Sequence, residues 1–284
     1  MNMRVAVAGT CGLALLIARE INDETSHQLV ILSRTVVDYN DPASLQYALG
    51  GVDTVISTVT GTPQLRLIEA AVQCRVRRFA PAEFEGQPGL RGQIDVLDRG
   101  KNAALALLQH YQGYIQYTVF VCGILYERFS VNGMRSQYMG SNTGYGSEGD
   151  YVANPRTMTA LAPVWDAGHN LSFLCLTSAY DVAQFVVRAL DMPVWAPEMS
   201  MYGERMTVID LLEVIRSCRN RQWSNVDYQD APSNSARYRQ LAPLVATAEG
   251  RYDFAVPGYL NALNPDIEPT TFRDWFLHNW ASIP

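Results

Sequence analysis

Lys101 is the residue whose type and position most strongly suggest chemistry. The chain has 284 residues, and all but one of its 22 Lys and Arg residues are arginine. An arginine keeps its charge at any biological pH, whereas a lysine can release its proton when burial or a nearby cation lowers its pKa. Lys101 could therefore act as a general acid or base, although a drift from lysine to arginine could also leave a single lysine by chance.

A glycine-containing turn near the N-terminus suggests a phosphate site. Val5–Ala8 reads as a buried strand, Gly9–Gly12 (Gly-Thr-Cys-Gly) as the turn and Leu13–Ile21 as the following helix. In such a unit the glycines let the backbone approach a pyrophosphate, and the N–H groups that begin the helix point at the anion. Leu15 replaces the third glycine of the usual pattern, so a buried hairpin or a helix cap would explain the two glycines equally well.

The second apolar segment, His27–Arg34, ends in Ser33 and Arg34. In parallel sheets that bind dinucleotides, the end of the second strand faces the adenosine ribose. An arginine there suits a 2'-phosphate, and no Asp or Glu is present to bind a free 2'-hydroxyl. The sequence therefore predicts NADP(H) in preference to NAD(H), unless Arg34 is simply solvated.

Strands and helices alternate through the N-terminal half of the chain. The expected strands are Val52–Thr58, Arg78–Phe84 and Tyr117–Val121, and the expected helices are Asp41–Leu49, Gln64–Gln73 and Asn102–His110. This alternation indicates an α/β protein with a doubly wound parallel sheet. A later helix, Thr177–Leu190, is expected to return to the sheet.

One stretch conflicts with this pattern. If Leu29–Leu32 and Val36–Tyr39 are neighbouring parallel strands, about a dozen residues must cross over between them, and only Ser33–Thr35 are available. Either Val36–Tyr39 is not a parallel strand, or a natural crossover is missing from this sequence, which we expect. A gap between successive Cα atoms well beyond the ~3.8 Å of a trans peptide would reveal the omission.

Several motifs together carry a family resemblance: Val5–Ala14, Asp38–Asp41, Leu45–Thr58, Arg78–Phe84 and Tyr117–Cys122. With these motifs the chain resembles the NmrA-like and isoflavone-reductase-like branch of atypical short-chain dehydrogenases, and within it the fungal members associated with secondary metabolism. The resemblance covers most of the chain. It implies a Rossmann domain at 1–125, to which 174–195 return, and a smaller C-terminal substrate-binding domain at 126–173 and 196–284.

The same resemblance implies site residues. Lys101 has the place of the family's catalytic lysine, at the start of a helix. The implied contacts to NADP(H) are Gly9, Thr10, Cys11, Gly12, Leu13, Ser33, Arg34, Ser57, Thr58, Glu83, Phe84, Lys101 and Cys122. The family's Pro-Ser-Glu-Phe-Gly is Pro-Ala-Glu-Phe-Glu in 81–85, so a hydroxyl and a glycine are lost. The family pattern is also longer at Asn234–Ser235.

Aromatic residues and a glycine-rich segment follow Cys122. Tyr126 and Phe129 precede Gly140–Asp150, and in the family this part of the chain builds the substrate pocket. We therefore expect Tyr126 and Phe129 to contact a small hydrophobic substrate. Aromatic residues of this kind are equally often core. The C-terminal stretch Phe272–Trp280 is expected to be an amphipathic helix that packs on this domain.

Composition argues against several other classes. A net charge of -6 without a long basic run is unsuited to nucleic acid. Five cysteines without a Cys-x-x-Cys pair indicate neither a disulfide framework nor a metal site, and they fit a cytoplasmic location. The apolar run Val5–Ala18 mimics a signal peptide, but its glycines favour a strand, turn and helix, so no membrane partner is expected. The usual Tyr-x-x-x-Lys pair cannot form because Leu97 stands four residues before Lys101.

Three functions remain compatible with these observations. The first is an NADPH-dependent reductase of a small conjugated or aromatic natural product, in which Lys101 supplies or relays a proton. The second is an NADP(H)-binding cyclase or isomerase of a natural-product intermediate, either non-redox or redox-cycling. The third is an NADP-sensing regulatory protein without catalysis, against which Lys101 argues. A monomer and a homodimer are both possible.

Overall fold

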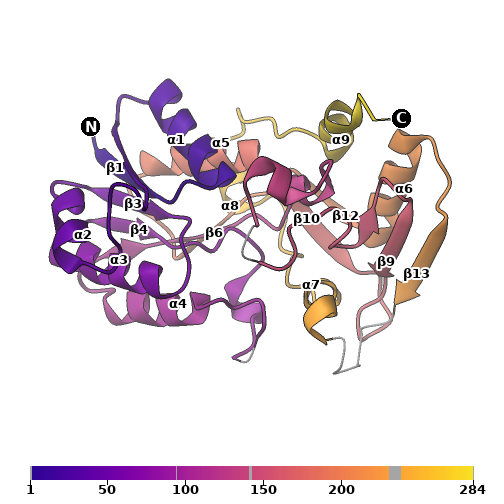
Figure 1. Cartoon of the computed structure of the whole chain (residues 1–284), viewed down its shortest axis with the longest axis horizontal. Coiled ribbons are helices and arrows are strands. Elements are labelled where there is room, and N and C mark those ends of the chain that lie inside the picture. The colour runs from indigo at the N-terminus through magenta and orange to yellow at the C-terminus, as the bar shows by residue number, and fades with distance from the viewer. Residues whose placement is uncertain (1, 94, 141–142, 230–237, 284) are drawn as a thin grey trace. The chain divides into compact units, whose positions relative to one another are not determined.

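The computed structural model describes residues 2–93, 95–140, 143–229 and 238–283 (Figure 1). The chain divides into two compact units. The first comprises Met1–Phe84, Asp98–Val121 and Val182–Met199, and the second comprises Glu85–Leu97, Cys122–Asp181 and Ser200–Pro284. The units differ from the expected domains in residues 85–97, 122–125 and 174–181, which belong to the second unit, and in residues 196–199, which belong to the first. The expected insertion at Asn234–Ser235 lies outside the described residues.

A parallel sheet of five strands forms the centre of the first unit. Its order is β2 (Gln28–Leu32), β1 (Arg4–Ala8), β3 (Thr54–Ser57), β4 (Arg78–Ala80) and β5 (Gln116–Tyr117). From β1 the chain first goes to β2 on one side and later to β3 on the other. The strand order therefore reverses at the carboxyl end of β1, where sheets of this kind bind ligands. The doubly wound α/β class is confirmed.

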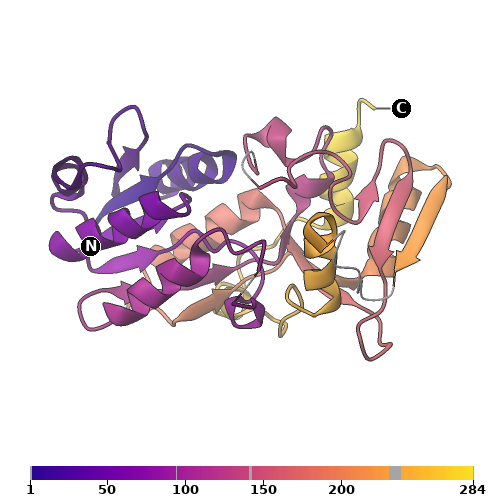
Figure 2. The same cartoon turned by 60° about the horizontal axis from the view of Figure 1, so that its bottom comes forward.

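Helices cover both faces of this sheet. α1 (Gly12–Glu24) lies on one face, and α2 (Pro42–Leu49), α3 (Thr62–Gln73) and α4 (Lys101–His110) lie on the other (Figures 1 and 2). Alternate residues of β1 explain the arrangement, since successive side chains of a strand point to opposite faces. On the face of α2, α3 and α4, one buried cluster contains Ala6, Ala8, Leu45, Leu67 and Leu108. The alternating Val5 and Val7 are also fully buried, so neither face of β1 is solvated.

The chain after β2 forms a turn. The N–H groups of Val36 and Val37 donate to the carbonyl of Ser33 at 3.0 and 2.9 Å. The buried Tyr39 donates its hydroxyl hydrogen bond to the carbonyl of Leu32 at 2.7 Å. This stretch is therefore not a strand, and α2 itself leads from β2 to β3. The expectation of a strand at Val36–Tyr39 was wrong, and without that strand the short connection after β2 needs no further crossover.

A buried arginine attaches the third piece of the first unit to the sheet. Arg78 of β4 is 1% exposed. Its guanidinium donates to the carbonyls of Leu190, Met192 and Pro193 at 2.9, 2.7 and 2.9 Å. These carbonyls lie at and beyond the end of α5 (Ala179–Leu190). Because a buried cation is costly unless its donors are satisfied, the contacts hold the end of α5 against β4.

The second unit is built from smaller sheets. One sheet has the order β12 (Glu204–Thr207), β10 (Phe173–Thr177) and β7 (Ile124–Leu125), and another has β13 (Asn225–Gln229), β9 (Thr159–Pro163) and β8 (Ala153–Asn154). The helices are α6 (Val208–Arg219), α7 (Tyr238–Ala248), α8 (Tyr259–Leu263) and α9 (Phe272–Trp280). The core is rich in aromatic side chains: Tyr126, Phe129, Tyr151, Phe272, Phe276 and Trp280. The C-terminal helix is thus confirmed, and its aromatic residues are core.

The last strand expected in the N-terminal half is interrupted. β5 ends at Tyr117 and β6 (Val119–Val121) pairs with β11 (Glu198–Ser200) instead of continuing β5. Between them, the N–H of Thr118 donates to the carbonyl of Phe79 at 3.2 Å. Among the described residues, no helix combines the length and the apolar character needed to span a bilayer.

Candidate functional site

The glycine turn lies at the carboxyl end of β1. Gly9 has a φ of +110°, and a side chain there would collide with the hydroxyl of Thr58, so only glycine fits. The N–H of Gly9 donates to the carbonyl of Leu32 at 3.1 Å, and the hydroxyl of Thr58 donates to the carbonyl of Ala8 at 2.9 Å. These bonds draw together the ends of β1, β2 and β3. The missing side chain of Gly9 lets Thr58 pack directly against the backbone of the turn.

The start of α1 is suited to an anion. Cys11 is the N-cap residue, its side chain makes no capping hydrogen bond, and the first turn contains no acidic residue. Thr10 is exposed, Cys11 and Gly12 are half-buried, and Leu13 is buried. The first N–H groups of a helix lack partners within the helix and lie at its positive end, which stabilises a phosphate. The turn and the helix start therefore fit a dinucleotide pyrophosphate.

Ser33 and Arg34 follow β2 directly. Arg34 is exposed, and Ser33 shares a hydrogen bond of 2.7 Å with the hydroxyl of Thr35. Burial raises the pKa of the neighbouring Tyr39 to about 12, an effect that the charge of Arg34 opposes. The Tyr39 hydroxyl therefore stays protonated at neutral pH and keeps its bond to the strand end. An exposed guanidinium beside this fixed strand end has the position expected for a contact to a 2'-phosphate.

Glu83 and Lys101 form a buried ion pair within the first unit. Nζ of Lys101 lies 4.0 Å from Oε2 of Glu83, and the two residues are 6% and 1% exposed. Glu83 comes three residues after β4, and Lys101 is the first residue of α4. The adjacent Phe84 stacks on Phe120 with 5.9 Å between the ring centroids. A carboxylate and an ammonium in such a buried place can hold a proton ready for transfer.

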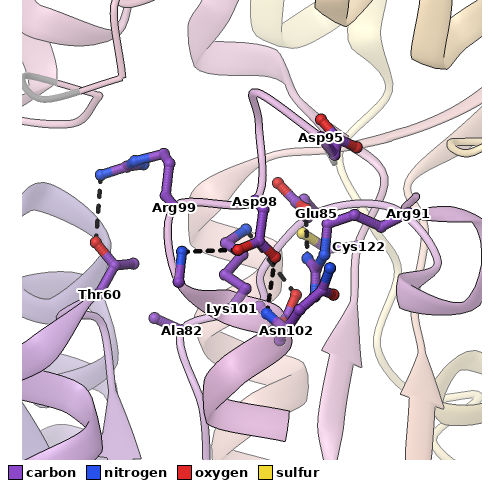
Figure 3. Close-up of polar contacts among 12 residues, drawn as sticks. Thr60, Ala82, Glu85, Arg91, Asp95, Asp98, Arg99, Lys101, Asn102 and Cys122 are labelled. Carbon is purple, nitrogen blue, oxygen red and sulfur yellow. Dashed lines mark hydrogen bonds and ion pairs between the residues drawn. The ribbon is translucent and has the colours of Figure 1, made fainter. Parts of the chain in front are cut away.

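Asp98 fixes the start of α4. Its carboxylate accepts the N–H groups of Gly100 and Asn102 at 2.9 and 2.7 Å, and its carbonyl accepts the N–H of Lys101 at 3.0 Å (Figure 3). Arg99 and Gly100 have φ values of 53° and 81°, so the chain turns sharply just before the lysine. A non-glycine residue in this region is strained and persists only when its surroundings hold it. Asp98 was not among the predicted residues, although an aspartate just before a helix is a recognisable start signal.

The loop after β3 connects the glycine turn with the start of α4. The guanidinium of Arg99 donates to the hydroxyl of Thr60 at 3.4 Å (Figure 3). A Cβ on Gly100 would lie 3.1 Å from the Cα of Gly61, so these two backbones are in close contact. Thr58, in the same loop, lies against the turn. The structure thus brings the predicted turn, the end of β3 and the predicted lysine into one continuous set of contacts.

Comparison with known proteins agrees with this geometry. No protein-family model matches the chain. It is similar to Oxidoreductase BOA1 of Botryotinia fuckeliana (strain B05.10), with 24% identity over 308 residues, covering 96% of this chain and 98% of that protein.

Solved reductases have the same architecture. The leucoanthocyanidin reductase–NADPH complex from Vitis vinifera matches with a TM-score of 0.71 and 16% identity, covering 97% of this chain and 98% of that one. The Citrobacter sp. triphenylmethane reductase complexed with NADP(H) matches with a TM-score of 0.68 and 14% identity, covering 97% and 99%. The chain has the Rossmann-type reductase fold. This fold agrees with the resemblance seen in the sequence.

Within the reductase fold, Gln64 is another residue that the sequence did not single out. It is fully buried in α3, and its Oε1 accepts the N–H of Ala82 at 2.7 Å, directly before Glu83. Ser57, which was predicted, is also buried, and its hydroxyl donates to the carbonyl of Val59 at 3.2 Å. Nothing local distinguishes Gln64, because its role depends on a partner that follows β4, 18 residues along the chain.

Three predicted residues belong to the second unit. Cys122 is buried, and its N–H donates to the carbonyl of Glu85 at 3.0 Å. Tyr126 and Phe129 are both 0% exposed in the aromatic core, and the hydroxyl of Tyr126 donates to the carbonyl of Thr270 at 3.1 Å. Their contacts to cofactor and substrate stay predictions. In the described ranges, no group of three or more His, Cys, Asp or Glu is placed to hold a metal ion.

Proposed function

We propose that this protein is an NADPH-dependent oxidoreductase that reduces a small hydrophobic natural product with a conjugated or aromatic system. The observation that carries the proposal is the buried Glu83–Lys101 pair, which lies in the same compact unit as the glycine turn. The reductase fold, the similar structures complexed with NADPH or NADP(H) and the similar fungal oxidoreductase support it.

The residues present fit NADPH. Gly9 holds a backbone conformation that favours glycine at the end of β1, the start of α1 is suited to the pyrophosphate, and Arg34 is exposed at the end of β2. When bound, NADPH supplies a hydride to the substrate. The arginine then determines the preference for NADPH over NADH, because its guanidinium pairs with the additional phosphate.

Lys101 supplies the proton that a reduction also requires. Its ammonium is held beside the carboxylate of Glu83, and both groups are shielded from water, which strengthens their interaction. Nζ donates its proton to the reduced substrate, and water returns one afterwards. Asp98 and Gln64 keep the two residues in place through the start of α4 and the backbone after β4. Catalysis thus depends on a residue that can release a proton.

Replacement of the lysine tests this role. Lys101→Met should lower kcat about 100- to 10,000-fold, the usual contribution of a positioned acid, while NADPH binding is retained. Lys101→Arg should lose nearly as much, because a guanidinium does not release its proton. The measurements are initial rates of NADPH oxidation with a panel of conjugated ketones and quinones, and NADPH fluorescence titration. Arg19→Met, on the exposed side of α1, is the control and should be fully active.

Stoichiometry separates reduction from the alternative chemistry. One NADPH consumed for each product formed supports the proposal. Turnover without net loss of NADPH would contradict it and favour a cyclase or isomerase. Full activity of both Lys101 variants would remove the lysine from the reaction.

A further inference from the structure

The segment of residues 85–97 links the two members of the buried ion pair along the chain. It begins two residues after Glu83 and ends four residues before Lys101. This segment belongs to the second unit, whereas Glu83 and Lys101 belong to the first. Both members of the pair are thus covalently attached to it, through Phe84 on one side and through 98–100 on the other.

A cluster of four charged side chains, two buried arginines and two half-buried carboxylates, holds the segment. Arg251 is 1% exposed, and its guanidinium donates to Oδ2 of Asp95 at 2.6 Å and to Oε1 of Glu85 at 2.7 Å. Arg91 donates to the same oxygen of Glu85 at 3.2 Å, and its side chain has no exposed surface (Figure 3). Arg251 therefore binds both the beginning and the end of the segment.

Main-chain contacts add to this attachment. The N–H of Gln87 donates to the carbonyl of Arg251 at 2.9 Å, and a side chain at Gly86 would collide with that same carbonyl. The carbonyl of Glu85 accepts the N–H of Cys122 at 3.0 Å. The segment is thus fixed on one side against Arg251 and on the other against the chain that follows β6.

Asp95 passes this constraint to the start of α4. Its second carboxylate oxygen accepts the N–H of Leu97 at 2.7 Å, and the next residue is Asp98, whose carboxylate accepts the N–H of Asn102 in the first turn of α4. Each residue of an extended chain spans at most about 3.6 Å, so three steps from Asp95 leave little slack before Asp98. A shift of Asp95 would therefore move the cap of the helix that begins with the lysine.

The geometry points to Arg251 as a positioning residue for the Glu83–Lys101 pair, an inference that rests on the proposed function for its effect on turnover. A guanidinium can donate to two carboxylates at once, which the single ammonium of a lysine does less well. Removal of Arg251 would leave the carboxylates of Glu85 and Asp95 close together and partly buried. Their repulsion would displace both ends of the segment.

The single lysine allows a direct test that needs no turnover. Reductive methylation with 13C-formaldehyde labels Nζ of Lys101 and the N-terminal amine, so the NMR spectrum contains one side-chain signal. Arg251→Met should shift or broaden this signal. Arg219→Met removes another buried arginine of the second unit, one that donates to the carbonyl of Ile283 at 2.8 Å, and should leave the signal unchanged. An unchanged signal in folded Arg251→Met would overturn the inference.

Kinetics provide the second readout. Arg251→Met should lower kcat on the order of 100-fold, as small misplacements of catalytic groups do, with NADPH binding retained. Arg251→Lys should recover part of this loss. If Arg251→Met does not fold, Asp95→Asn keeps the contact between Arg251 and Glu85 and should still shift the lysine signal; no shift would overturn the inference. If the wild-type protein does not oxidise NADPH, the proposed function is contradicted. The inference about Arg251 is still tested in that case, because the NMR comparison needs no turnover.

Discussion

The arginines and the single lysine of this protein have different roles. Arg78 and Arg251 are each 1% exposed and hold carbonyls or carboxylates, and the exposed Arg34 is placed for an anionic ligand. None of these roles requires a proton to leave, so a guanidinium suits them all. Lys101 lies beside the carboxylate of Glu83, where a releasable proton is useful.

Arg34 tests the preference between the two nicotinamide cofactors. Arg34→Ala should weaken NADPH binding by about 1–3 kcal/mol, the range for a hydrogen bond to a charged group, and should change NADH binding little. Fluorescence titration gives both dissociation constants. Arg19→Ala, another exposed arginine of the first unit, should change neither. Equal affinities of the wild type for NADPH and NADH would contradict the assignment.

Residue type alone marked only part of the site. Lys101 could be singled out because it is the only lysine in the sequence, and the glycine turn because it follows an apolar strand. Asp98, Gln64 and Arg251 were missed, since carboxylates, amides and arginines are common and their roles depend on partners. The partner of Gln64 is 18 residues away in the chain, and those of Arg251 are 156 and 166 residues away. Such pairings arise from tertiary structure and leave no local pattern.

Helix starts were predictable because their signals are local. Asp41 caps α2, Thr207 begins a complete capping box at α6, and Thr271 caps α9. The stretch after β2 was misjudged for the opposite reason. Val36 and Val37 are residues typical of strands, but both N–H groups bond to Ser33 in a turn. Strand preference depends on the neighbours that a residue finds in the fold.

The first residue of α5, Ala179, is bound by the titratable carboxyl group of Glu127. Glu127 is 4% exposed and accepts the N–H of Ala179 at 3.0 Å. Burial raises the pKa of Glu127 to about 7, although the bond from Ala179 acts in the opposite direction. Burial also raises the pKa of Asp181, which lies two residues after Ala179 in α5. The folded protein therefore binds a proton at Glu127 more tightly than the unfolded chain does.

This difference predicts a pH-dependent stability. As the pH rises from 4.5, the ordinary pKa of a glutamate, to about 7, the ionisation of Glu127 lowers the free energy of unfolding progressively. Above about pH 7 this loss stays constant. Glu127→Gln cannot ionise and should lack this loss. Between pH 5 and 8 the wild type should lose about 3 kcal/mol of unfolding free energy relative to Glu127→Gln.

Urea unfolding at several pH values provides the measurement. Glu213→Gln, at an exposed site where the partner Arg216 lowers the pKa, should show no such loss relative to the wild type. A difference between the wild type and Glu127→Gln that does not change with pH would contradict the prediction.

At the scale of the whole molecule, most of the predicted site lies in one unit. The predicted cofactor contacts other than Cys122 belong to the first unit, and Tyr126 and Phe129 belong to the second. The fold class and the roles of the N-terminal elements could be predicted because alternating strands and helices have few stable arrangements. The exact division of the chain could not, since 85–97 joins the second unit through the partners of Arg251.

NADPH should protect the first unit selectively. Hydrogen–deuterium exchange should slow in residues 9–13, 33–35, 57–61 and 98–104. Because the ligand binds the folded state, 100 times its dissociation constant should add about 2.7 kcal/mol to stability. NADH at the same concentration should protect less. Protection restricted to the second unit would contradict the placement of the cofactor.

The attachment of Arg78 to the end of α5 has a consequence for the order in which the protein can fold during synthesis. The guanidinium lies in β4, but its carbonyl partners, including those of Met192 and Pro193, leave the ribosome more than a hundred residues later. Until then the arginine must remain hydrated, since its burial without partners would be costly. The N-terminal sheet can therefore reach its final packing only after residues 85–97 and 122–181 of the second unit have been made, and a fragment ending at Val121 would lack what satisfies its own core.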